Sequence, residues 1–360
     1  MIWQHDEPNR KNWFLSKKLE SISLYESQAQ KITEIDTTQR DLPIYVCGLT
    51  PYDSAHLGHA FTYSVFDLLI RFLRQSQKNV SYVQNITDVD DPLFERARRD
   101  GVNWKEIAES QIDKFVIDMQ AIAVIAPDVF VSVSDEMETI IKSKLKLHDK
   151  NNLYKLVDDW YYRIEKIDSE LVSSWTNTQL RDTFSQRGGD LNRTGKLNPF
   201  DAVVWKRSLA DEPSWDSNLG PGRPGWHIEC VAIIEKYLSL PLFIQGGGKD
   251  LIFPHHAICA MQAKSLTTKE LAKNYLHVGL VAYQGEKMSK SLGNLVFVSD
   301  LLSKKYSAAA IRAHLISQKW NEDWEWKEAD LKLFQQRTDI WREKFTSAPV
   351  TDELIDIVFV

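Results

Sequence analysis

The stretch from residue 43 to residue 85 constrains the fold more than any other part of this 360-residue chain. Residues Pro43–Leu49 are predicted to form a short buried strand, and Asn79–Asn85 are predicted to form a second one. Between them lies an amphipathic helix, predicted over Leu57–Gln75, with apolar residues at helical spacing: Phe61, Val65, Leu68, Leu69 and Phe72. Strand, helix and strand in so short a stretch predict a βαβ unit. Such a unit begins a parallel sheet whose carboxyl ends receive ligands.

The rest of the chain continues the α/β pattern with one interruption. Further helices are predicted over 103–125 and 226–238, from near Pro254 and from Ala308 onward. Further strands are predicted over 202–205, 242–245 and 275–281. Residues 134–199 are less regular, apart from a strand-like run at 160–164, and we interpret them as an insertion packed on the core.

Composition excludes several classes of protein. The chain has 44 basic and 50 acidic side chains, a net charge of −6, which argues against binding to a long stretch of nucleic acid. No apolar run approaches the roughly 20 residues of a membrane span, and the first 30 residues lack the apolar core of a signal peptide. We therefore expect a cytoplasmic protein without a membrane partner. The three cysteines lie far apart and form no disulfide framework.

The string His56-Leu57-Gly58-His59 follows the first strand and opens the predicted helix. Two imidazoles three residues apart lie on one face of a helical turn, and Gly58 leaves room for a nucleotide to approach the backbone. A helix N-terminus also favours phosphate. Taken alone, a chance histidine pair capping a helix is the commoner explanation.

A second string, Lys287-Met288-Ser289-Lys290-Ser291, carries two lysines in a short loop. These lysines can reach nucleotide phosphates and stabilise the charge of departing pyrophosphate, although a solvated basic loop explains them equally well. In this order and on an α/β core, the two strings resemble the signature of class I aminoacyl-tRNA synthetases. The resemblance implies a Rossmann-like parallel sheet and ATP-dependent activation of an amino acid, with His56, His59, Lys287 and Lys290 as catalytic residues.

The surroundings of the cysteines narrow the resemblance. Cys47 ends the first strand, Cys230 lies in Gly225-Trp226-His227-Ile228-Glu229-Cys230, and His255 precedes His256 in a string that begins at Gly246. These strings resemble those of cysteinyl-tRNA synthetases, in which two cysteines and the first of two histidines bind zinc. The resemblance implies one Zn2+ per chain, held by Cys47, Cys230 and His255. An open coordination position would accept the substrate's thiolate, which serine cannot replace well.

Four further strings resemble the mycothiol ligase family, paralogues of cysteinyl-tRNA synthetases that join cysteine to the amine of glucosaminyl-inositol. They are residues 45–53, 85–97, 187–190 and 220–226, within a resemblance that covers about 42–294. The family's Glu-Arg-Gly-Gly-Asp-Pro string is matched by Arg187–Asp190 but departs at Gln186 and Leu191.

The family resemblance implies the ligands, the site and the division of the chain. The expected ligands are L-cysteine, ATP with Mg2+, and glucosaminyl-inositol, without tRNA. The residues expected around the adenylate are Cys47, Gly48, Leu49, Thr50, Thr62, Asn85, Ile86, Thr87, Trp226, Gly248, Lys249, Asp250 and Val281. The expected regions are an N-terminal extension (1–40), two halves of a catalytic domain (41–133 and 201–300), an inserted connective region (134–200) and a short helical C-terminal region (301–360).

Two other functions stay open at this point. A short cysteinyl-tRNA ligase would need a stem-contact region and an anticodon-binding domain after Ser291, where 69 residues follow. The tail tryptophans, which could stack on bases, are interleaved with acidic residues and are expected to pack a helical core. A non-catalytic sensor of cysteine or ATP would not need the lysines of the second string.

Two local questions also remain open. Cys259 stands four residues after His255, where cysteinyl-tRNA synthetases carry a zinc-binding glutamate. It could close the zinc site as a fourth ligand or pack in the apolar face of a helix that starts near Pro254, and we favour the open site. Asp88, Asp90 and Asp91 could contact substrate or form a solvated or capping turn.

Overall fold

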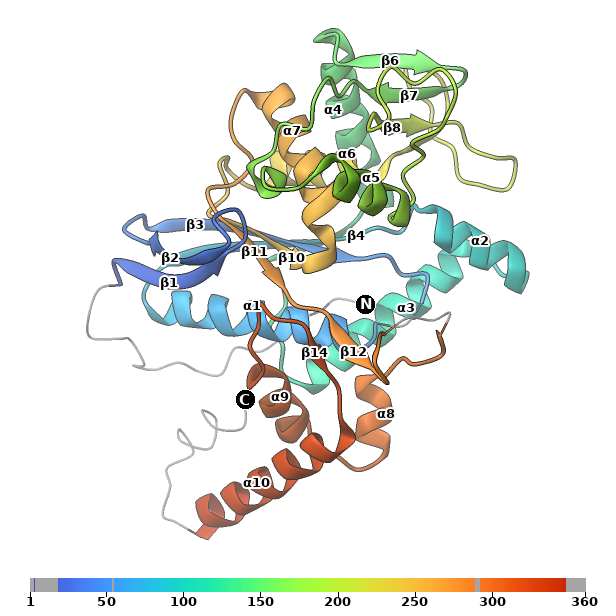
Figure 1. Cartoon of the computed structure of the whole chain (residues 1–360). Coiled ribbons are helices and arrows are strands. Elements are labelled where there is room, and N and C mark those ends of the chain that lie inside the picture. Colours follow the sequence, from blue (N-terminus) through green and yellow to red (C-terminus); the bar gives the residue numbers. More distant parts are fainter. Residues whose placement is uncertain (1–2, 4–18, 54, 289–291, 348–360) are drawn as a thin grey trace.

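A five-stranded parallel sheet forms the centre of the molecule (Figure 1). The computed structural model describes residue 3 and residues 19–53, 55–288 and 292–347. The strand order is β11–β10–β3–β4–β5, and every neighbouring pair is parallel. In that order the strands span Tyr275–Val278, Ile244–Gly248, Asp41–Leu49, Asn79–Ile86 and Val129–Ser132. The predicted α/β class with a parallel sheet is confirmed.

Helices cover both faces of this sheet (Figure 1). One face packs on α1 (Leu57–Gln75) and α3 (Trp104–Ala121), and the other packs on α4 (Met137–Asp149), α6 (Trp226–Tyr237) and α7 (Ala257–Thr267). Strand β3 serves both layers because successive side chains of a strand point to opposite faces. Ile44 and Val46 belong to the core with α1, whereas Tyr45 and Cys47 belong to the core with α6 and α7.

The position of β3 in the sheet places the ligand-binding crevice. Its two neighbours are β4, which follows it in the chain, and β10, which is about 200 residues away. The order of the strands therefore reverses beside β3. A ligand is expected at such a point, beyond the carboxyl ends of the strands. The chain leaves β3 there and enters the N-terminus of α1.

Most predicted core elements appear with small shifts. Helix α1 has the predicted bounds, and β10 begins at Ile244, two residues later than predicted. The helix predicted from near Pro254 is confirmed. Helix α7 spans Ala257–Thr267, and in the π-helical turn before it, Ile252–His256, only Phe253 departs from helical dihedral angles. Phe253 is extended (φ −139°, ψ 138°) because a residue before proline is sterically excluded from helical geometry.

The region predicted to be irregular is well ordered. It contains α4, α5 (Asn177–Gln186) and two strands, β6 (Leu153–Leu156) and β7 (Asp159–Tyr162). These strands continue into β8 (Ala202–Lys206) and β9 (Arg223–Pro224) as a four-stranded antiparallel sheet. The strand predicted over 202–205 is therefore confirmed, but it belongs to this antiparallel sheet and does not continue the central parallel sheet. It pairs with β7, and an alternating strand pattern does not reveal which sheet a strand joins.

Several further elements were not predicted. Residues Ser21–Glu26 (β1) and Lys31–Asp36 (β2) form an antiparallel hairpin within the expected N-terminal extension. Helix α2 spans Asp91–Asp100 and packs beside α3. Single helical turns lie at 134–136, 170–172 and 249–251.

The C-terminal region packs against the crevice from the α1 side (Figure 1). Strand β12 (Val281–Tyr283) pairs with β13 (Glu286–Lys287) and with β14 (Trp324–Glu325), so Lys287 of the second string lies in the same small sheet as the strand that precedes α10. Helices α8 (Val298–Ser303), α9 (Ala308–Ile316) and α10 (Glu328–Ser347) complete this region. Trp326 is buried, and Trp320 and Trp324 pack on the same core, as predicted, whereas Trp341 is exposed.

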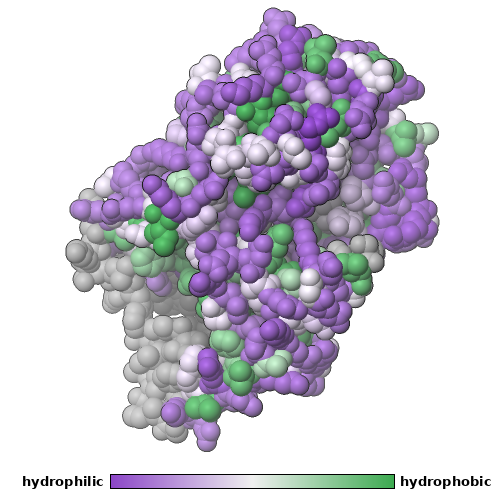
Figure 2. Space-filling view, viewed as in Figure 1, coloured by the Kyte–Doolittle hydropathy of each residue, from purple (hydrophilic) through white to green (hydrophobic). Residues whose placement is uncertain are grey.

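The surface offers no large apolar area on the face seen in Figure 2. Hydrophilic residues cover most of it, and hydrophobic ones lie in small separate groups. Among the residues described, no helix combines the length and the hydropathy that crossing a bilayer requires.

Candidate active site

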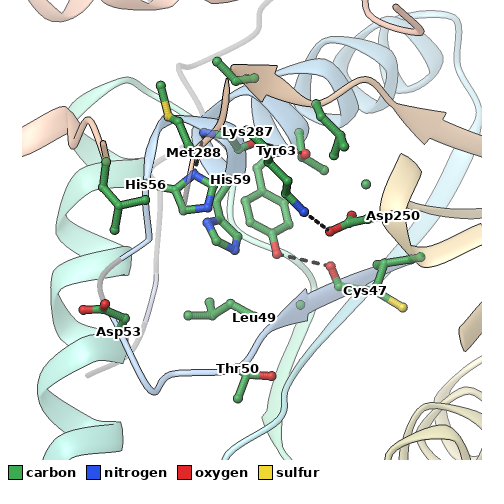
Figure 3. A pocket seen from close by; sticks show the side chains of 18 of the residues that line it. Cys47, Leu49, Thr50, Asp53, His56, His59, Tyr63, Asp250, Lys287 and Met288 are labelled. Carbon is green, nitrogen blue, oxygen red and sulfur yellow. Dashed lines mark hydrogen bonds and ion pairs between the residues drawn. The ribbon is translucent and has the colours of Figure 1, made fainter. Parts of the chain in front are cut away.

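A cavity of about 460 Å³ opens at the carboxyl end of β3, where the fold predicts a ligand (Figure 3). The end of β3, the start of α1, the end of β10 and the β12–β13 hairpin all contribute to its wall. Twelve residues predicted for the site line it: Cys47, Gly48, Leu49, Thr50, His56, His59, Thr62, Trp226, Gly248, Asp250, Val281 and Lys287. Lys290 lies outside the described residues.

The two histidines of the first string stand at the N-terminus of α1. His56 is the N-cap, and its Nδ1 accepts a hydrogen bond from the Gly58 amide at 3.0 Å. The His59 ring lies 4.4 Å from that of His56, centroid to centroid. Burial lowers the pKa of His56 to about 3 and that of His59 to about 4, so both imidazoles are neutral at physiological pH. The Nδ1 atom of His59 is buried and has no hydrogen-bond partner in the described part of the protein.

A carboxylate holds the lysine of the second string at the opposite wall (Figure 3). The Nζ of Lys287 lies 3.0 Å from Oδ2 of Asp250, and Nη1 of Arg187 lies 3.4 Å from the same oxygen. Burial raises the pKa of Asp250, but Lys287 and Arg187 outweigh burial, and the pKa falls below its usual value. Asp250 is therefore an anion shared between two cations.

The floor of the cavity depends on a close approach of β3 to β4. The register of the two strands shifts between Val46 and Leu49, which places Cys47 and Gly48 in a bulge. The Gly48 amide donates to Oδ1 of Asn85 at 3.0 Å, and the Tyr45 hydroxyl donates to the same oxygen at 2.7 Å. Asn85 in turn donates to Oγ1 of Thr87 at 3.1 Å.

Four of the residues predicted around the adenylate do not line the cavity: Asn85, Ile86, Thr87 and Lys249. The first three are buried behind the end of β3, where Asn85 holds the Gly48 backbone. Lys249 points to Asp323, with Nζ 3.1 Å from its Oδ2. Asp323 directly precedes β14, so this ion pair connects the end of β10 to the region of β14.

A buried cluster of thiols and imidazoles lies behind Cys47. The Sγ of Cys47 is 3.1 Å from Nε2 of His256, whose Nδ1 is 2.7 Å from Nε2 of His277. The ligand atoms of Cys47, His255 and His256 all lie within 4.8 Å of one another. Cys230 contacts both Cys47 and His255. Hydrogen bonding to Cys47, together with the charge of His255, brings the pKa of its thiol well below the ordinary value.

The chemistry of this cluster fits a zinc ion. Its three cysteines are buried and form no disulfide, and they lie beside histidines. Thiolate and imidazole are the two side-chain types that Zn2+ prefers. Near Cys47, the amide oxygen of Gln245 and Nδ1 of His277 have no partner among the described residues. A buried donor set with unsatisfied polar atoms is expected where an ion completes the site. The structure thus groups two of the predicted ligands, Cys47 and His255, with His256, whereas the third, Cys230, contacts Cys47 and His255 but is not part of that group of candidate ligand atoms.

The three aspartates after β4 have structural roles. Asp90 caps α2 through a hydrogen bond from the Asp91 amide at 2.8 Å, and burial raises its pKa to about 6. Asp88 accepts hydrogen bonds from the amide and hydroxyl of Ser134. Asp91 pairs with Lys206 and Arg223. These contacts confirm the capping alternative for Asp90.

Several residues of the site were not predicted. Tyr52, Asp53, Tyr63, Arg187, Met288 and Leu295 line the cavity, and His227, His256 and His277 belong to the thiol–imidazole cluster. Some carried a signal: Arg187 and His227 lie in strings already singled out, and Asp53 and Tyr52 follow β3 directly. His277 carried none, because it reaches the cluster through the pairing of β10 and β11, where it stands opposite Gly247.

Comparison with known proteins agrees with this geometry. Residues 33–336 match the family described as tRNA synthetases class I (C) catalytic domain. The chain is 44% identical over 321 residues to the L-cysteine:1D-myo-inositol 2-amino-2-deoxy-alpha-D-glucopyranoside ligase of Acidothermus cellulolyticus, which covers 89% of this chain and 79% of the relative. It is 42% identical over 347 residues to the ligase of the same name from Corynebacterium glutamicum, covering 94% and 86%.

Solved structures show the same fold at low sequence identity. Methionyl-tRNA synthetase of Mycobacterium tuberculosis, in complex with methionyl-adenylate, aligns with a TM-score of 0.63 at 17% identity, over 82% of this chain and 68% of that one. A leucyl-tRNA synthetase from Agrobacterium radiobacter K84, in a ternary complex, aligns with a TM-score of 0.60 at 11% identity, over 87% and 73%. At these identities the likeness shows the fold alone.

Proposed function

Because the chain belongs to the mycothiol ligase family, a branch of the class I synthetases and thus a family of ATP-using ligases, we propose that it activates L-cysteine with ATP. A cysteine carboxylate oxygen attacks the α-phosphorus, the bond to the β-phosphate breaks, and pyrophosphate leaves. The amine of 1D-myo-inositol 2-amino-2-deoxy-α-D-glucopyranoside then attacks the carbonyl carbon. Its C–O bond to AMP breaks, AMP leaves, and the nitrogen loses a proton as the amide forms.

One observation carries this proposal. The phosphate-binding features and a thiol of the metal cluster open into the same cavity, because the N-terminus of α1 and Cys47 both flank the end of β3. A nucleotide at α1 and a cysteine side chain at Cys47 would therefore lie at two ends of one space. Their reacting groups would meet near Gly48. Positioning of this kind supplies much of the rate enhancement of a reaction between two bound substrates.

At the phosphate end, His56 and His59 act as neutral hydrogen-bond donors beside a helix N-terminus. Lys287 supplies the positive charge that stabilises the departing pyrophosphate. Its partner Asp250 keeps a second cation, Arg187, when Lys287 turns toward a phosphate. The pair Arg187–Asp250 thus allows Lys287 to change partners without leaving a buried carboxylate uncompensated. Mg2+ bound with ATP would share the neutralisation of the phosphates.

At the cysteine end, the residues that would hold Zn2+ are Cys47, Cys230 and His255, with His256 beside Cys47. Zinc there would supply a Lewis acid that binds the thiolate of the substrate cysteine. The hydroxyl of serine is a much weaker ligand for zinc, so serine would be bound less well. Gln245 donates to Sγ of Cys47 at 3.6 Å and so orients that thiol. His277 contacts His256 and orients its ring in the same way. Trp226 stacks on His255, with ring centroids 4.1 Å apart, and shields it from the cavity.

The first experiment measures cysteine-dependent exchange of labelled pyrophosphate into ATP in the absence of RNA. We expect exchange with cysteine and much slower exchange with serine or alanine. Exchange that is equally fast with serine would contradict selection by thiolate. Binding of cysteine and ATP without any exchange would favour a non-catalytic sensor.

A second experiment assigns the acceptor. Preformed cysteinyl adenylate on the enzyme is mixed with glucosaminyl-inositol or with cysteine tRNA, and its decay is followed in a single turnover. We expect the sugar amine to accelerate release of AMP and tRNA to leave the rate unchanged. Acceleration by tRNA alone would reverse the assignment.

A further inference from the structure

Three buried residues form a second group of metal-ligating atoms beside the first. The ligand atoms of His227, His255 and Cys259 lie within 4.8 Å of one another. Nδ1 of His227 is 3.0 Å from Nδ1 of His255. The Sγ of Cys259 is 3.9 Å from the same nitrogen of His255 and 3.8 Å from its Nε2. This second group has one residue, His255, in common with the first group of Cys47, His255 and His256.

These separations are close to those that a metal ion imposes on its ligands. Zinc–nitrogen and zinc–sulfur bonds of about 2.0–2.1 Å and 2.3 Å at tetrahedral angles place two nitrogens about 3.3 Å apart, and a nitrogen and a sulfur about 3.5 Å apart. The observed distances of 3.0 Å and 3.9 Å differ from these values by a few tenths of an ångström. Small side-chain rotations would bring all three donors to one ion.

The local fold explains why the three donors converge. His227 lies in the first turn of α6, and Cys259 lies in the first turn of α7, two helices that pack together on the same face of the sheet. His255 stands in the irregular turn that precedes α7. The Cys259 thiol donates to the carbonyl oxygen of His227 at 3.4 Å, so its sulfur faces the group.

This group lies behind the wall of the cavity. Cys47 lines the cavity, whereas His227, His255 and Cys259 do not. All three are buried, and Cys259 is 0% exposed. The Trp226 ring, which lines the cavity, stacks on His255 and lies beside His227. An ion held by this group would be out of reach of a substrate in the cavity.

We propose that His227, His255 and Cys259 form an inner binding position for a thiophilic divalent cation, separate from the outer position at Cys47 and Cys230. A neutral imidazole has one lone pair for a metal, so His255 serves one position at a time. An ion in the inner position therefore removes His255 from the outer one. The inner position thus competes with the outer one for His255, and it lies outside the cavity in which the substrate binds.

Co2+ alone is the probe for this position, and the measurement needs no substrate. The Cys47→Ser/Cys230→Ser chain, freed of metal with a chelator, is titrated with Co2+. We expect it to bind close to one ion per chain, with the sulfur-to-cobalt absorption of a single thiolate. Adding Cys259→Ala should abolish this absorption and weaken binding about 100-fold, since losing a direct ligand costs at least as much as losing an outer partner.

A matched control separates ligation from general damage to a buried histidine. His314 is 1% exposed and packs among Trp324, Trp326 and Phe334, far from the cysteines. In the doubly substituted chain, His227→Gln should weaken Co2+ binding, whereas His314→Gln should not. A folded doubly substituted chain that binds no Co2+ would overturn the proposal. Binding that is unchanged by Cys259→Ala would overturn it equally.

A second measurement avoids the double substitution in case that chain fails to fold. The cadmium NMR shift reports how many thiolates hold the ion, so Cd2+ at one equivalent can be placed in the otherwise native chain. We expect one resonance from the outer thiolates and another from the single thiolate of Cys259, the second being absent from Cys259→Ala. Identical spectra from the two chains would refute an inner position.

Discussion

Replacing Gly48 by alanine tests the link between the close approach of β3 to β4 and the cavity. A Cβ on Gly48 would lie 1.5 Å from the backbone oxygen of Asn85 and 2.6 Å from its carbonyl carbon. The obstacle is backbone in the middle of a sheet, so no side-chain rotation can relieve it. The two strands must separate locally by about 2 Å to restore van der Waals contact.

The expected loss of stability follows from the contacts that such a separation breaks. Three hydrogen bonds join the strands there: Gly48 N to Asn85 Oδ1 at 3.0 Å, Tyr45 hydroxyl to Asn85 Oδ1 at 2.7 Å, and Thr87 N to the Leu49 carbonyl at 3.0 Å. At about 1 kcal/mol each they contribute about 3 kcal/mol. The steric strain adds about 1–3 kcal/mol. Gly48→Ala should therefore lower the free energy of unfolding by about 4–6 kcal/mol, a large part of the stability of most domains.

Equilibrium unfolding in urea measures this loss, with Gly101→Ala as the control. Gly101 caps the C-terminus of α2 at φ +65° with nothing within 4 Å of a built Cβ. Its replacement should cost only the left-handed backbone penalty of about 1–2 kcal/mol. Because Gly48 also lines the cavity, any folded Gly48→Ala protein should show slower pyrophosphate exchange. A Gly48→Ala protein no less stable than Gly101→Ala would refute the argument from close approach.

Two further predictions concern charged groups. Lys287→Ala should slow cysteine-dependent pyrophosphate exchange by about 100- to 1000-fold. Lys264→Ala is the control, because it breaks a comparable pair with Glu270 away from the cavity and should leave the exchange rate unchanged. Equal exchange rates in the two variants would remove Lys287 from catalysis. The free energy of unfolding should fall as pH drops from about 6.5 toward 4, because His59 takes up a proton at about 6.5 when unfolded but at about 4 when folded. His59→Asn should reduce that slope by about 1.4 kcal/mol per pH unit in urea unfolding, and a parental slope would contradict the buried neutral imidazole.

The sequence predicted the elements whose pattern is local. Helix α1 was predicted with its observed bounds, but of the five apolar residues that indicated it only Phe61 is buried, and Leu68 is 50% exposed. The buried face is formed by Phe61, Phe66, Ile70 and Leu73. Strand β3 was predicted within two residues of its start because a buried parallel strand is apolar throughout. One part of the cavity wall follows from these two elements, since the end of β3 and the start of α1 are adjacent in the chain.

What depends on partners distant in the sequence was not predictable. Strand β8 has the pattern of a core strand, but it pairs antiparallel with β7 and β9 and not with a strand of the parallel sheet. Asn85 matches an adenylate-binding position, yet its amide is directed at the Gly48 backbone. Whether a polar side chain at the end of a strand faces a ligand or a neighbouring strand depends on the bulge, which no single strand encodes.

The bulge also explains how two chemistries meet at one strand end. Along β3, Ile44 and Val46 face the α1 layer, and Tyr45 and Cys47 face the layer of α6 and α7. Regular alternation would direct Leu49 to the same side as Cys47. Leu49 instead packs in the core with α1, because the register shift between Val46 and Leu49 reverses the alternation. Cys47 is thus turned toward the histidines of α6 and α7, while the next residues turn toward the N-terminus of α1. The spacing between the thiol and the helix N-terminus is set by this one irregularity, and a strand without it would direct Leu49 into the thiol–imidazole cluster.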